Sequence, residues 1–78
     1  MKLIAEHWGS DTYSDRWAEI FEDTKRDCFV VRYYLNKKLI ETRDMITDGC
    51  AHSMRYAEDA AENYCLGYMA LDGMKNDE

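Results

Sequence analysis

The segment Cys28–Leu35 constrains the fold most, because it has the pattern of a strand with large apolar side chains on both faces. Side chains alternate between the two faces of a strand. One face would carry Phe29, Val31, Tyr33 and Leu35, and the other would carry Cys28, Val30, Arg32 and Tyr34. Both faces need cover, and a single helix covers one of them. The second face therefore requires the N-terminal segment, a second subunit or a partner.

The length of the chain limits how large a core it can build. With 78 residues it is expected to form one small domain over residues 1–74, followed by a flexible acidic tail at 75–78. Oligomerisation is a natural supplement to so small a core. The 46% hydrophobic content argues against disorder, despite 33% charged residues and a net charge of -6.

Turn residues indicate a meander around the central strand. Strands are predicted at residues 17–22 and 38–46, joined to Cys28–Leu35 by turns at 24–27 and 36–37. Residues 2–7 are compatible with a further strand and equally with irregular structure. We therefore predict an α+β fold: a three-stranded antiparallel meander, extended if the N-terminal strand forms, packed on one C-terminal helix.

The C-terminal part of the chain has helical periodicity. Ser53 is a plausible N-cap for a helix running to about Leu71, with Gly73 just past its end. The apolar helix face would carry Met54, Ala57, Ala61, Tyr64, Cys65 and Tyr68. It would pack on the sheet face that carries Ala18, Ile20, Phe29, Val31, Tyr33, Leu35, Ile40 and Ile46.

The two proposed turns set the pairing between strands, and the charges agree with it. A loop at 24–27 places Glu19 opposite Arg32, and a loop at 36–37 places Glu41 opposite Arg32. Opposite charges across strands stabilise a sheet, so the arginine between two carboxylates supports both turns. The second face then forms the predicted interaction surface, made of Trp17, Glu19, Phe21, Val30, Arg32, Tyr34, Leu39, Glu41 and Met45.

Two other kinds of site are alternatives to a protein interface. Residues 24–43 carry six basic and two acidic side chains, which is the pattern of a basic hairpin able to meet nucleic-acid phosphates. The acidity of the remaining chain opposes that interpretation. Cys50 and His52 lie close in one loop, but their spacing to Cys28, Cys65 and His7 matches no metal-ligand pattern. The odd number of cysteines indicates free thiols in a reducing compartment.

The stretch SMRYAEDAAENYCLG, residues 53–67, follows a strand-rich half and resembles small uncharacterised proteins of tailed phages that infect marine cyanobacteria. The resemblance covers roughly residues 17–69. It implies an origin, and it carries no functional residues over to this chain. It also implies a host protein as a further partner.

The sequence as a whole predicts a non-enzymatic protein-interaction module that forms a homodimer through the second sheet face. No catalytic motif, cofactor motif or glycine-rich phosphate loop is recognised. The alternatives are a nucleic-acid-binding domain using the hairpin at 24–43 and a small metal or thiol protein. Glu6 and His7 interrupt the first residues before any signal-peptide core, so a cytoplasmic location is expected, that of the host if the protein is phage-encoded.

Overall fold

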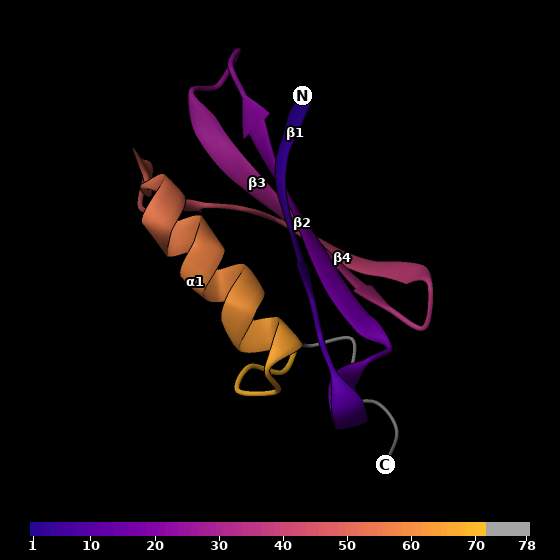
Figure 1. Cartoon of the computed structure of the whole chain (residues 1–78). Helices are drawn as coiled ribbons and strands as arrows, with labels where there is room; N and C mark the ends of the chain where they lie inside the picture. The colour runs from indigo at the N-terminus through magenta and orange to yellow at the C-terminus, as the bar shows by residue number, and fades with distance from the viewer. Residues whose placement is uncertain (72–78) are drawn as a thin grey trace.

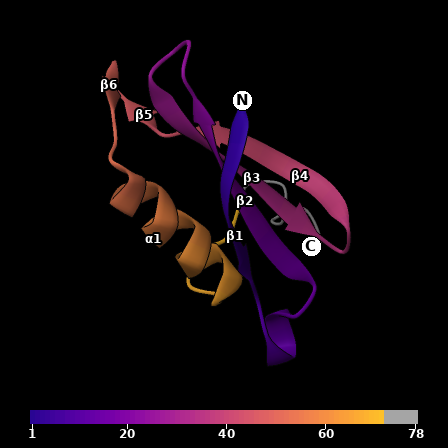
Figure 2. The same ribbon diagram turned by 45° about the horizontal axis from the view of Figure 1, so that its top comes forward.

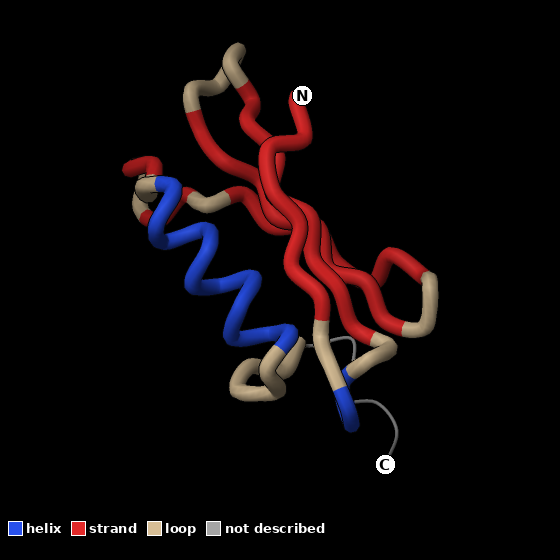
Figure 3. Tube along the Cα trace, viewed as in Figure 1, coloured by secondary structure: helices blue, strands red, loops and turns tan. Residues whose placement is uncertain are grey.

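The computed structural model describes residues 1–71. Four antiparallel strands form a sheet in the order β1-β2-β3-β4, and one helix lies across one face of it, as predicted (Figures 1 and 3). The elements of this α+β fold are β1 (Lys2–Trp8), β2 (Arg16–Asp23), β3 (Cys28–Leu35), β4 (Lys38–Asp44) and α1 (Met54–Cys65). The predicted tail at 75–78 and Gly73 lie outside the described residues.

The two predicted turns of the meander are confirmed. Asn36 and Lys37 both have positive φ, 56° and 69°, as a two-residue hairpin turn requires. In the turn at 24–27, the carboxylate of Asp23 accepts hydrogen bonds from the backbone N–H groups of Lys25 and Arg26. A side chain that closes a turn in this way is a common use of aspartate. Both strand pairs therefore start from the predicted register.

The register between β3 and β4 departs from the prediction beyond the first two pairs. Tyr34 lies opposite Leu39, but Tyr33 lies opposite Glu41, so Ile40 is the extra residue of a bulge. Thr42 then occupies the position opposite Arg32 that was expected for Glu41. The predicted pairing of Arg32 with Glu41 is wrong, because a bulge moves every later residue of the strand by one position.

The N-terminal strand forms, and it extends the sheet at its edge. β1 pairs with β2, with Trp8 opposite Trp17, and a register shift falls between Leu3 and Ala5. This strand lies beside β2 rather than over a face of the sheet (Figure 1). The segment therefore enlarges the second sheet face and leaves it uncovered. A short 3-10 helix, Asp11–Tyr13, connects β1 to β2.

The loop expected between β4 and the helix contains a small hairpin of its own, β5 (Ile46–Thr47) and β6 (Cys50–Ala51) (Figure 2). Asp48 and Gly49 turn it with φ of 53° and 81°. Ile46 was expected in the core as the end of the preceding strand. The chain leaves the sheet at Asp44, and Ile46 is exposed in this hairpin.

Helix α1 docks through the predicted face but ends earlier than expected. Ala57, Ala61, Tyr64 and Cys65 are buried. The helix stops at Cys65 because Gly67, with φ of 86°, takes the left-handed conformation and donates to the Tyr64 carbonyl, while the Tyr68 N–H donates to the Asn63 carbonyl. Tyr68 is 80% exposed, so its predicted docking is wrong.

The core lies between this helix and the sheet face below it. It contains Ala18, Ile20, Val31, Tyr33, Met45, Ala57, Ala61, Tyr64, Cys65 and Leu71. The Tyr64 hydroxyl donates to the Tyr34 carbonyl over 2.8 Å, and an Arg16 Nη donates to the Tyr64 carbonyl over 2.9 Å. These bonds hold the end of the helix on β2 and β3. The helix therefore covers this face of the sheet, and the opposite face remains open.

Candidate interaction surface

The sheet face turned away from α1, called the open face below, is the candidate site. In residues 1–71 the helix covers the opposite side of the sheet (Figure 1). Strand alternation and the register place the following side chains on the open face: Leu3, Glu6, Trp8, Trp17, Glu19, Phe21, Asp23, Cys28, Val30, Arg32, Tyr34, Leu39, Thr42 and Asp44.

Three aromatic rings form a ladder across the open face. Trp8 stacks on Trp17 with centroids 5.0 Å apart, and Trp17 stacks on Tyr34 at 4.7 Å. The interplanar angles are 23° and 10°, so the rings contact one another through their faces. Leu39 continues the row on β4, opposite Tyr34. Trp8 and Leu39, at the two ends, are 61% and 50% exposed.

The other half of the open face is already covered by the chain itself. Val30 is 1% exposed and Cys28 is buried, although neither belongs to the core beneath the helix. The guanidinium of Arg32 lies 4.6 Å from the ring centre of Phe21, next to Val30. Arg26, in the turn at 24–27, extends to Asp23 and Asp44 on the same half of the face. Apart from Leu3, which is 44% exposed on β1 opposite Phe21, the exposed large apolar side chains of the open face are therefore those of the ladder row.

Arg26 is the arginine that lies between two carboxylates. Its Nε donates to Asp23 over 2.8 Å, and its two Nη atoms donate to Asp44 over 2.8 and 3.0 Å. The prediction had given this role to Arg32. A long side chain at a turn can reach carboxylates on two strands without being opposite either of them, so strand register alone does not reveal it.

The Arg26 bridge makes stability depend on pH. Hydrogen bonds from Arg26 hold the pKa values of Asp23 and Asp44 below their usual range in the folded state. A carboxyl whose pKa is lower when folded stabilises the protein above its unfolded pKa, and this contribution is lost as the pH falls through the folded value. We expect the loss of stability between pH 5 and pH 2 to be smaller in Arg26→Leu than in the parent, measured by urea denaturation across that range. An equal loss in both proteins would contradict this assignment. The effect is modest because Arg26 and Asp44 are nearly half exposed, and solvent weakens their interaction.

Arg32 lies opposite Glu19, as predicted, yet it forms no ion pair with any carboxylate of residues 1–71. The Glu19 carboxylate instead accepts a hydrogen bond from the Tyr34 hydroxyl over 2.9 Å. Burial raises the pKa of Tyr34, and the bond to Glu19 adds to the shift. Glu6 lies opposite Glu19 on the next strand. Like charges in that position repel. Beside its ladder, the open face therefore carries an unfavourable pair of carboxylates, Glu6 and Glu19, together with the Arg32 guanidinium.

Most of the predicted interaction residues share the open face, and two do not. Trp17, Glu19, Phe21, Val30, Arg32, Tyr34 and Leu39 lie there, whereas Glu41 and Met45 were placed there wrongly. The bulge at Ile40 puts Glu41 on the helix side, where it pairs with Arg43, and Met45 is buried in the core. Trp8 and Glu6 also lie on the open face, but they were not predicted there. The signal for both was the period-2 alternation of the N-terminal strand, extended as far as Trp8.

The residues weighed as metal ligands are dispersed in the fold. Cys28 and Cys65 are buried and Cys50 is exposed in β6. The Cys65 thiol donates to the His7 carbonyl, and burial raises the pKa of that thiol to about 11. In the described part of the chain no three His, Cys, Asp or Glu side chains group into a metal site. The one α-helix among residues 1–71 is too short and too polar to cross a membrane.

Comparison of the chain with protein-family models, with curated proteins and with solved structures gives no match. The functional argument therefore rests on the geometry of the open face.

Proposed function

We propose that this chain is a non-enzymatic protein-interaction module that forms a homodimer through the ladder half of its open face. The observation that carries the proposal is the row Trp8, Trp17, Tyr34 and Leu39, exposed at both ends. It lies next to the Arg32 guanidinium, which has no ion pair within residues 1–71. Exposed apolar patches rimmed by charges are typical of protein interfaces. A domain of this size also gains stability from association.

A second copy suits this surface because the charges on it are self-complementary. A two-fold axis in an isologous dimer brings each surface patch against the same patch of the partner. With the axis near Glu19, Arg32 of one subunit would approach the carboxylates of the other, where Glu6 and Glu19 are adjacent. Each subunit would then neutralise the like-charge pair of its partner, and the ends of both ladders would be buried.

The ladder geometry argues against the nucleic-acid alternative. A platform for bases offers ring faces outward, whereas Trp17 here has one face on Trp8 and the other on Tyr34. The basic side chains of the hairpin do not form one patch. Arg26 is bound by two carboxylates at one end of β3, and Lys37 and Lys38 lie at the opposite end. Glu6 and Glu19 would repel phosphates beside the same surface.

Leu39→Glu is expected to convert the dimer into a folded monomer. The side chain is half exposed in the single chain, so the change costs little in the fold but places a charge in the apolar contact. Light scattering across a concentration series measures the mass, and circular dichroism checks the fold. Leu66→Glu is the matched control, because Leu66 is 48% exposed at the end of α1, and it should leave the dimer intact. A parent that remains monomeric at every concentration, or a Leu39→Glu variant that dimerises like the parent, would contradict the proposal.

A further inference from the structure

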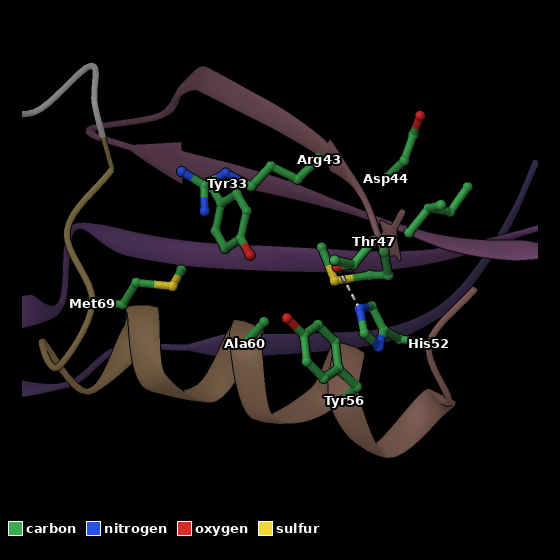
Figure 4. A pocket seen from close by; sticks show the side chains of 10 residues that line it. Tyr33, Arg43, Asp44, Thr47, His52, Tyr56, Ala60 and Met69 are labelled. Carbon is green, nitrogen blue, oxygen red and sulfur yellow. Dashed lines mark hydrogen bonds between the residues drawn. The ribbon is translucent and has the colours of Figure 1, made fainter. Parts of the chain in front are cut away.

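A pocket of ≈ 240 Å³ lies on the helix side of the sheet, away from the open face (Figure 4). Its walls come from β3, the end of β4, the β5–β6 hairpin and α1, with Met69 closing one side. An engineered apolar cavity of about 150 Å³ is enough to hold benzene. The pocket here has room for a single ring with a short substituent.

The polar group that marks this pocket is the hydroxyl of Tyr33. The side chain is fully buried, and its oxygen has no hydrogen-bond partner among residues 1–71. Figure 4 shows the Tyr33 hydroxyl pointing from the sheet toward the space in which the Tyr56 hydroxyl, from α1, also points. A buried hydroxyl without a partner is costly. Burial raises its pKa to about 12, so the group remains a neutral O–H donor at neutral pH.

The remaining lining favours an uncharged aromatic ligand. Met45 and Met69 contribute thioethers, which contact aromatic rings favourably. Thr47 and His52 are already joined by a hydrogen bond of 2.7 Å, and His52 stacks on Tyr56 at 3.7 Å, so these polar groups are engaged with one another. The charges at the rim are paired as well, Arg43 with Glu41 and Asp44 with Arg26. The buried donor that has no acceptor among residues 1–71 is the Tyr33 hydroxyl.

We propose that this pocket binds a small, neutral aromatic molecule whose carbonyl oxygen accepts a hydrogen bond from the Tyr33 hydroxyl. The ring lies between the thioethers of Met45 and Met69, and the carbonyl points toward β3. This binding site is separate from the proposed dimer surface, because none of its lining residues belongs to the ladder row. The inference therefore does not depend on self-association.

Acetophenone and α-methylstyrene form the test pair, since the second replaces the carbonyl oxygen of the first by a methylene group of similar shape. Each is titrated into the protein with ¹³C-labelled methionine methyl groups, so that Met45 and Met69 report on the pocket while Met1 reports on a distant surface. We expect saturable shifts at Met45 and Met69, with acetophenone binding roughly threefold to tenfold more tightly, the effect of one neutral hydrogen bond.

Tyr33→Phe is the matched variant, since it removes the hydroxyl without changing the ring. It should lose the preference for acetophenone, because the carbonyl then has no donor in the pocket. It should melt no lower than the parent, because the hydroxyl removed has no partner in the described part of the chain. Three results would overturn the inference: no saturable shift with acetophenone, equal affinity of the parent for both compounds, or a preference for acetophenone that persists in Tyr33→Phe.

Discussion

Ala61→Glu is expected to unfold the protein at room temperature. Ala61 is fully buried where α1 meets the sheet, among Val31, Tyr33 and Tyr64, and a glutamate there would bury a charge with no partner. A cost of about 4 kcal/mol or more is at the upper end for single substitutions. The stability of typical domains is ~5–15 kcal/mol, and for a chain this small, near the low end of that range, the substitution would remove most of it. Urea denaturation followed by circular dichroism measures it.

Asn63→Glu provides the control for the added charge, because Asn63 lies on the exposed side of the same helix. It should shift the denaturation midpoint only slightly. An Ala61→Glu variant with the midpoint of the parent would show that α1 docks through a different face.

Arg32→Leu is expected to prevent dimerisation at pH 7 while leaving each subunit folded. The leucine still covers Phe21, but Glu6 and Glu19 of the opposing copy lose the cation proposed to face them. Removing one member of a desolvated ion pair costs about 3–5 kcal/mol, which is roughly 100-fold or more in affinity. Analytical ultracentrifugation measures the dissociation constant.

Two measurements separate this effect from a general loss of charge. Arg55→Leu makes the same change on the exposed side of α1 and should dimerise like the parent. Acidification toward pH ~4 protonates carboxylates and should partly restore the Arg32→Leu dimer. Normal dimerisation of Arg32→Leu at pH 7 would mean that Arg32 does not face the partner's acids.

The parts of the fold that local chemistry determines could be predicted from the sequence. The lengths of the turns at 24–27 and 36–37 set the register of β2 with β3 and of the first two pairs of β3 with β4. The pairing of Glu19 with Arg32 followed from the first of these turns. The bulge at Ile40 could not be predicted, since a β-branched residue in a strand gives no signal of an irregularity. That one residue moved Glu41 and Met45 off the interaction surface.

The end of the helix was misjudged for a different reason. Tyr68 continues the apolar spacing of α1, which indicates a longer helix, whereas Gly67 indicates that the helix ends before it. The prediction followed the spacing. The structure shows that the left-handed Gly67 ends the helix, because the N–H groups of Gly67 and Tyr68 then donate to the Tyr64 and Asn63 carbonyls of the last turn. The pocket lined by Tyr33 could not be predicted from the sequence, because it forms between segments that are distant in the sequence.

The irregular edges of the sheet bear on how large an assembly this chain can build. β1 has its register shift at Ile4 and β4 has its bulge at Ile40, so each of the two outermost strands is interrupted. An uninterrupted edge would offer incoming chains a template for endless strand addition, as in a fibril. With both borders of the sheet broken, growth by that route is disfavoured, and the contact proposed through the open face would end at two copies.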